Sequence, residues 1–194
     1  TGFPEGLGFR VRDIYFPVNI ENNKKTGKSI KSVYELGYNP FQEINHEWNL
    51  ITAKNSKGEV NTMTASWGAQ GILWGKPTCT VYVRQSRYTK TFIDDQDYFT
   101  VSLFDGNTYR KQLTTLGRVS GRDTDKIKDV DFHIAMVEDQ PTFEEAKAVF
   151  ICIKMYQDDI KIEDMPSDVV EKQYKDGDIH TMYIGEIVAC YVNE

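Results

Sequence analysis

The feature that most constrains the fold of this chain is a series of short segments in which side chains alternate with a period of two. Residues 78–84 read TCTVYVR, so hydroxyl, aromatic and basic residues alternate with cysteine and valine. Residues 98–104 and 144–156 show the same alternation, and residues 181–192 form a last long apolar segment. Because successive side chains of a strand point to opposite faces, this pattern predicts β-strands.

The connections between these strands are predicted to be turns and short helices. Residues 48–55 and 59–66 predict a hairpin around the turn formers at 56–58. Short helices are predicted at 90–96 with Thr89 as cap, at 107–116 with Gly117 as its end, at 125–130 and at 168–173, and residues 132–141 are predicted to be irregular or a weak strand. Many strands, short helices and no internal repeat predict a mainly β fold, a barrel with helical connections.

Length and composition restrict the class of protein. The chain has 194 residues, which suits one domain with a sizeable core. Its net charge of −6 argues against a nucleic-acid or membrane-surface binder, since such proteins present a basic surface. No run of about 18 apolar residues and no hydrophobic leader is visible, so we expect a cytoplasmic protein without a membrane partner.

The first 36 residues are predicted to be an extension of a domain that occupies residues 37–194. Residues 11–20 predict a short strand broken by Pro17, and the lysine-rich residues 22–31 predict a solvated loop. Two interpretations are open for the extension. It wraps around the barrel or a partner subunit, or it is a loosely ordered arm.

Cysteine and histidine spacing predicts neither a disulfide framework nor a metal site. The three cysteines lie in apolar, strand-like segments and the three histidines are scattered; they are Cys79, Cys152, Cys190, His46, His133 and His180. An odd number of cysteines without a CxxC pair favours buried thiols. We therefore expect no metal.

The stretch 61–75, NTMTASWGAQGILWG, is the first candidate for a ligand site. As a strand, its first part is rich in small hydroxyls and poor in large aliphatic side chains, which suits the wall of a site for a flat ligand with a polar edge. Gly68 and Gly71 are expected to turn the backbone and to allow close approach, and Trp67 and Trp74 to bracket that turn. The alternative is an ordinary hairpin edge, because serine and threonine are common on strands.

The segments NTMTASWG, WGKPTCTVYVR, RYTKTFIDDQDYFTVSLF, SGRDTDK and HTMYIGEI follow one another in the chain. In this order they resemble the flavin reductase-like family, over roughly residues 38–192. Members of that family bind FMN in a split β-barrel. The resemblance implies an antiparallel Greek-key split barrel, FMN as cofactor, and a homodimer with the flavin near the subunit interface.

The resemblance assigns cofactor contacts to three segments. The first strand would line the isoalloxazine with Asn61, Thr62, Met63, Thr64, Ser66 and Trp67. The segment RQSRYT would bind the phosphate with Arg84, Ser86, Arg87, Tyr88 and Thr89, because arginine binds phosphate bidentately and a helix start adds free amides. The loop SGRDTDK would bring Ser120, Gly121, Arg122 and Lys126 close to the flavin.

Each of these assignments has a simpler alternative. The arginines of RQSRYT can be a solvated pair near the acidic residues 94–95, and the charges of SGRDTDK can neutralise one another on an exposed loop. His180 is the catalytic candidate, as a residue that orients a nicotinamide or supplies a proton, and its alternative is a surface or capping residue.

The functional prediction is an FMN-dependent oxidoreductase that takes a hydride from NADH or NADPH and passes electrons to an acceptor. The alternative is an electron-transfer protein that holds FMN without nicotinamide activity of its own, as flavoredoxins do. A third interpretation, a barrel for another ligand, is disfavoured by the NTMTASWG and RQSRYT segments. The acidic insertion at 157–176 is a candidate for controlling access to the site.

Overall fold

The computed structural model describes residues 28–193, so the strand predicted around Pro17 lies outside the described residues. Eight strands form one antiparallel sheet and two form a hairpin. The strands are β1 (Lys28–Ile30), β2 (Asn49–Lys54), β3 (Val60–Ala65), β4 (Gly68–Leu73), β5 (Lys76–Arg84), β6 (Tyr98–Leu103), β7 (Ile134–Val137), β8 (Gln140–Phe143), β9 (Ala148–Asp159) and β10 (His180–Asn193).

The helices are short and connect the strands. They are η1 (Val33–Glu35), α2 (Pro40–Gln42), the π-helical turn η2 (Glu43–Glu47), α3 (Tyr88–Asp95), α4 (Gly106–Arg118), α5 (Lys126–Asp129), η3 (Ile162–Asp164) and α6 (Ser167–Gln173). Within the described residues, none of these helices is long and apolar enough to cross a membrane.

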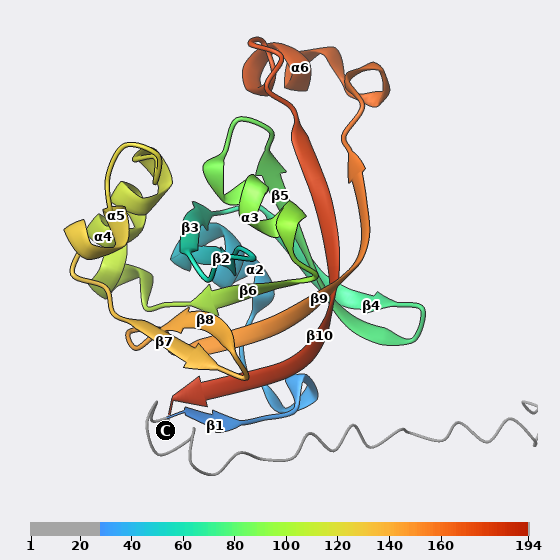
Figure 1. Ribbon diagram of the computed structural model, residues 1–194. Coiled ribbons are helices and arrows are strands. Elements are labelled where there is room, and N and C mark those ends of the chain that lie inside the picture. The colour runs from blue at the N-terminus through green and yellow to red at the C-terminus, as the bar shows by residue number, and fades with distance from the viewer. Residues whose placement is uncertain (1–27, 194) are drawn as a thin grey trace, which may run out of the picture.

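The sheet order β3-β2-β6-β9-β10-β5-β4 places a Greek key at its centre. Strand β5 pairs with β10, β10 with β9, and β9 with β6, while the connection from β5 to β6 crosses back over the sheet. Figure 1 shows β9 and β10 running together through the molecule, with α6 projecting beyond their ends. The sheet is not closed, and the predicted mainly β, antiparallel, Greek-key fold is confirmed.

The core explains why β9 carries little polar alternation in its first half. On β9, Phe150 and Cys152 belong to the main core, while Val149 and Ile151 pack in a second cluster on the other face. Both faces of the first half of β9 are therefore apolar. The three cysteines are buried free thiols, as predicted.

Several local predictions were wrong. Residues 68–73 form β4 instead of a turn, and the turn lies at Trp74 and Gly75, whose φ values are 52° and 73°. Residues 132–141, predicted to be irregular or a weak strand, contain strand β7, so the second alternative is confirmed there. The hairpin with β8 was not predicted, and its turn uses Glu138 and Asp139 at positive φ without a glycine. Part of the predicted loop at 22–31 is strand β1, which pairs with β10.

Two helix ends also differ from the predictions. Helix α3 begins at Tyr88, after Arg87, so Thr89 does not cap it. The Thr89 hydroxyl instead accepts a hydrogen bond from Asn61 Nδ2 at 3.0 Å. Gly117 lies inside α4, which continues to Arg118. A side chain at Gly117 would press against Thr64, so this glycine allows α4 to pack on β3.

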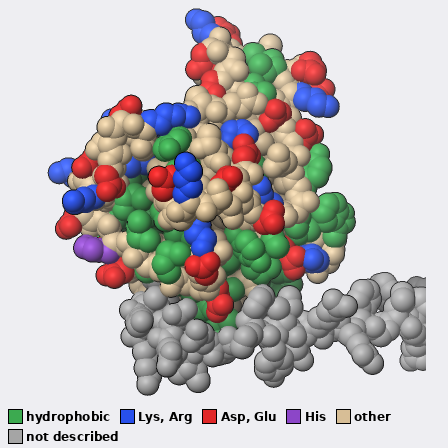
Figure 2. Space-filling model, viewed as in Figure 1, with side chains coloured by type: hydrophobic (Ala, Val, Ile, Leu, Met, Phe, Trp, Pro, Cys, Tyr) green, Lys and Arg blue, Asp and Glu red, His purple; other side chains and the backbone are tan. Residues whose placement is uncertain are grey.

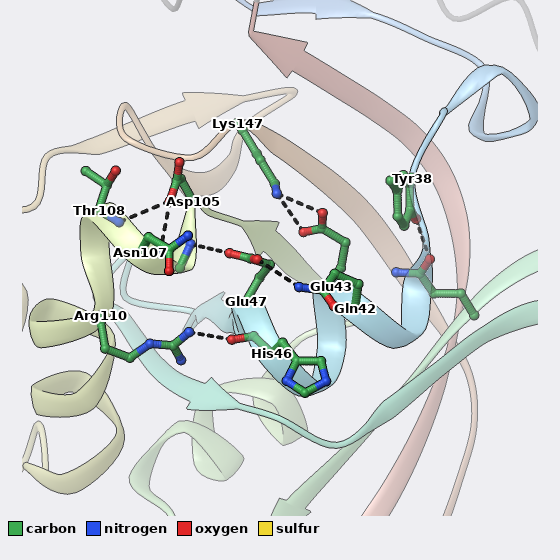
Figure 3. Close-up of polar contacts among 12 residues, drawn as sticks. Tyr38, Gln42, Glu43, His46, Glu47, Asp105, Asn107, Thr108, Arg110 and Lys147 are labelled. Atoms are coloured by element: carbon green, nitrogen blue, oxygen red, sulfur yellow. Dashed lines mark hydrogen bonds and ion pairs between the residues drawn. The ribbon is translucent and has the colours of Figure 1, made fainter.

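The segment from α2 to η2 is fastened to the rest of the molecule by polar contacts (Figure 3). Glu47 accepts a hydrogen bond from the first amide of α4, Gly106 N–H, at 2.6 Å, and this bond lowers the pKa of Glu47. Lys147 Nζ lies 2.8 Å from both carboxylate oxygens of Glu43, a residue only 7% exposed. These contacts fix the position of Ile44, between the two glutamates.

Lys147→Met is expected to destabilise the protein by about 1–2 kcal/mol, because it leaves the Glu43 carboxylate buried without its cation. The effect is smaller than for a fully buried pair, since the Lys147 side chain is 43% exposed. Urea unfolding measures it, and the double variant with Glu43→Gln should recover most of the loss. A single variant as stable as the wild type would contradict this account.

Candidate functional site

Two cavities lie along β5, and both are lined in part by the connection between β9 and β10. The first is polar, with a volume of about 250 Å³, and is formed by β3, the β5–α3 connection and the α4–α5 connection. Its lining contains most of the predicted cofactor residues, namely Asn61, Met63, Arg84, Ser86, Arg87, Tyr88, Thr89, Ser120, Gly121, Arg122 and Lys126. Three segments far apart in the sequence therefore meet here as predicted, while their binding of a cofactor stays a prediction.

The polar cavity is strongly cationic. Arg84, Arg87, Arg122 and Lys126 line it, and Asp178 is the only carboxylate residue in its lining within the described part of the chain. Among residues 28–193, no carboxylate oxygen lies within 4.0 Å of Arg87, Arg122 or Lys126. Arg87 is half-buried and Lys126 is buried, whereas Arg122 is exposed. Because buried and half-buried cations without an ion-pair partner are costly, Arg87 and Lys126 favour a bound anion.

Lys126 and Arg87 are held by the last turn of α4. Lys126 is 4% exposed, and its Nζ donates to the carbonyls of Leu116 and Val119 at 2.9 and 3.0 Å. Arg87 Nη1 donates to the carbonyl of Gly117 at 2.7 Å. Cations suit the negative end of a helix dipole. Burial and the neighbouring Arg87 nevertheless lower the pKa of Lys126 to about 8.

The opposite wall of this cavity depends on close packing around Gly121. A Cβ atom at Gly121 would collide with the side chain of Asn61, which bonds Thr89. Arg122 Nη1 donates to the carbonyl of Ser86 at 3.1 Å, and its guanidinium lies 4.7 Å from the centre of the Tyr88 ring. The two loops are therefore joined to each other directly.

The second cavity is larger and mainly apolar, with a volume of about 450 Å³. It contains the predicted residues Ser66 and Trp67, and it is completed by Phe41, Ile44, Asn45, Gly68, Tyr82, Ile160 and Tyr174. The Trp67 side chain is 42% exposed. Large aromatic surfaces around an apolar hollow are typical of sites for flat ligands.

His180, the predicted catalytic residue, lines neither cavity and is buried next to Trp67. The centres of the two rings are 5.2 Å apart, and the Tyr174 hydroxyl lies 2.9 Å from His180 Nδ1. Burial, with a smaller contribution from Arg84, lowers the pKa of His180 to about 4. The imidazole is therefore neutral at pH 7.

Thr62 and Thr64 line neither cavity. The hydroxyl of Thr62 lies 2.8 Å from that of Thr52 on β2, and the hydroxyl of Thr64 donates to the carbonyl of Leu113 at 2.5 Å. These side chains fasten β3 to its neighbours. The strand alternation explains this result, because Asn61 and Met63 are the residues that face the polar cavity.

Sequence reasoning missed several lining residues. Arg118 and Val119 directly precede the predicted loop, and extension of that loop by two residues would have found them. Tyr174 comes from the acidic insertion at 157–176 and Asp178 lies two residues beyond it, and no local pattern marks a site at either position.

Comparisons with known proteins agree with this fold. A search of curated proteins found no match. Among solved structures, flavoredoxin of Desulfovibrio vulgaris (Miyazaki F) is 23% identical, with 84% of this chain and 76% of that chain covered and a TM-score of 0.61. An FMN-binding domain of a flavin reductases-like enzyme from Shewanella baltica OS155 is 16% identical, with 86% and 77% covered and a TM-score of 0.61.

A third structure, assigned as a flavin reductase with a split barrel domain from Shewanella frigidimarina NCIMB 400, is 17% identical. The match covers 76% of this chain and 67% of that chain, with a TM-score of 0.62. These likenesses show the fold, and the model of the flavin reductase like domain matches residues 41–194. The chain therefore belongs to the flavin reductase-like domain family.

Proposed function

We propose that this protein is an FMN-binding oxidoreductase whose polar cavity receives the flavin phosphate. The observation that carries the proposal is the group of cations in that cavity, since Arg87, Arg122 and Lys126 have no carboxylate partner among the described residues. A phosphate dianion supplies the missing charge and accepts several hydrogen bonds at once. The relatives named for FMN binding support the same ligand.

The neighbouring apolar cavity is the candidate for the flavin ring. Ser66 and Trp67 directly follow β3, so this strand and the two residues after it connect the two cavities. When bound, FMN would supply the redox chemistry by accepting a hydride and releasing electrons to an acceptor. The protein's part is to bind, to orient and to exclude water.

His180 is proposed to act in this site as a neutral group. With its pKa near 4 it holds no extra proton at pH 7, so it cannot serve as an imidazolium donor there. Its contacts with Trp67 and the Tyr174 hydroxyl favour a role in shaping and polarising the wall of the apolar cavity.

The test is the absorption spectrum of the purified protein with added FMN, followed by anaerobic NADH and NADPH. Bound flavin that bleaches with one nucleotide supports a reductase and identifies its donor. Bound flavin that bleaches only with dithionite supports the carrier alternative, which the flavoredoxin relative favours. Absence of any flavin binding would refute both.

A homodimer is also proposed. Exposed apolar side chains gather on the β4–β5 hairpin, seen at the right of Figure 2, where Ile72 is 59% and Trp74 is 69% exposed. Phe41, at the mouth of the apolar cavity, is 83% exposed. A second copy would cover such surfaces. Light scattering of the eluted protein measures the mass, and a monomer at micromolar concentration contradicts the proposal.

FMN affinity is expected to fall about twofold between pH 7 and 8 and about tenfold by pH 9. The pKa of Lys126 is about 8 in the free protein, and a bound phosphate raises it, so binding takes up a proton increasingly as the pH rises through 8. The phosphate itself stays dianionic in this range, since its second pKa is about 6. Fluorescence titration with FMN measures the profile, and an affinity that rises above pH 8 would contradict it.

A further inference from the structure

The excursion, residues 160–178 between β9 and β10, closes one side of both cavities. It contains η3 and α6 and projects from the top of the molecule in Figure 1. Ile160 and Tyr174 line the apolar cavity, and Asp178 lines the polar one. The excursion is therefore part of the site and not a remote surface loop.

The Asp178 carboxylate binds donors in the polar cavity that an anionic ligand could use. Its Oδ1 accepts the backbone N–H of Ser86 at 3.0 Å, and its Oδ2 accepts the Ser86 hydroxyl at 2.6 Å. Its Oδ2 also lies 4.0 Å from Arg84 Nη1. A backbone amide, a hydroxyl and a guanidinium are the donors that a phosphate uses.

The rest of the excursion is docked through the same arginine. Arg84 Nη1 donates to the carbonyl of Asp178 at 2.6 Å, and Arg84 Nη2 donates to the carbonyl of Gln173 at 2.9 Å. Its guanidinium lies 5.4 Å from the centre of the Tyr174 ring. Arg84 and Ser86 are thus occupied by the excursion, while Arg87, Arg122 and Lys126 have no carboxylate partner within residues 28–193.

We propose that Asp178 is an internal competitor of the flavin phosphate, which must displace this carboxylate from Ser86 and Arg84 to bind fully. The inference rests on the proposed FMN site. Two negative groups cannot share these donors without strong repulsion. When only a fraction of the molecules has the excursion released, the apparent association constant for FMN equals the intrinsic constant multiplied by that fraction. The competition keeps the flavin exchangeable and acts on the phosphate, not on the ring.

The experiment compares the affinities of FMN and riboflavin, which lacks the phosphate, in the wild type and in Asp178→Asn. The substitution keeps the size of the side chain and removes its charge. FMN affinity should rise about tenfold or more, while riboflavin affinity should stay unchanged. Asp164→Asn, an exposed residue of the same excursion, makes the same charge change away from the cavity and should alter neither affinity.

Hydrogen exchange of the wild type gives a second readout that does not depend on a variant. Saturating FMN should speed exchange in peptides covering 161–178, because displacement of Asp178 releases the excursion, whereas riboflavin should leave that exchange unchanged. Ordinary ligand binding would slow it. Unchanged or weaker FMN affinity in Asp178→Asn, or slower exchange with FMN, overturns the inference. Failure of the wild type to bind either flavin refutes the proposed function instead.

Discussion

Lys126→Met is expected to weaken FMN binding by about 10- to 100-fold at pH 7, which corresponds to the loss of one charge-assisted hydrogen bond. Lys126 is buried at the carbonyl end of α4, and the structure holds its Nζ with two carbonyl bonds. A preplaced cation loses little side-chain entropy when the anion arrives. The variant should also lose the fall in affinity above pH 8, since no titrating lysine remains there.

The control for this variant is Lys128→Met on the same short helix. Lys128 is exposed and does not line the polar cavity, so the net charge changes equally while the site stays intact. FMN affinity should be within about twofold of the wild type, because exposed charges are screened. Circular dichroism establishes that both variants are folded at the temperature of the titration. Equal FMN affinities of the two variants would show that Lys126 does not bind the phosphate.

The sequence predicts the strands well because their signal is local. Side chains alternate along 78–84 because one face of β5 is more deeply buried than the other. They also alternate along 98–104, where the structure places β6, although both faces of that strand are buried. The residues of the polar cavity could also be predicted from the sequence. Arginines before a helix and a small Ser-Gly loop have a physical reason to bind an anion. The resemblance supplied the order in which these segments meet.

Other features depend on contacts that no local pattern contains. Asp178 lies more than ninety residues from Ser86, and the pairing of β10 with β5 brings them together. Gly117 allows α4 to pack closely on β3, so the hydroxyl of Thr64 bonds a carbonyl of α4. In the sequence alone, this threonine looks like a residue that could bind a ligand. A hydroxyl on a strand is therefore weak information about a site until its partners are known.

Gly185 shows how packing can reverse what strand preference alone predicts. Glycine is unfavourable inside a strand, so alanine at this position would be expected to stabilise β10. In the structure, a Cβ atom on Gly185 would lie 2.7 Å from Phe99 Cζ and 2.8 Å from Cys152 Cβ. Phe99 and Cys152 are both fully buried, so neither can move aside into solvent.

Gly185→Ala is therefore expected to destabilise the protein by about 2–3 kcal/mol, as overpacked cores typically do. Gly71→Ala is the matched control, because Gly71 also lies in a strand but has no atom within 4 Å of its added Cβ. That variant should be neutral or slightly more stable. Urea unfolding of both variants measures the difference. If Gly185→Ala were as stable as Gly71→Ala, the core around Phe99 would be less tightly packed than in the structure. The close approach of β10 to β6 and β9 would then not explain why a glycine occupies position 185.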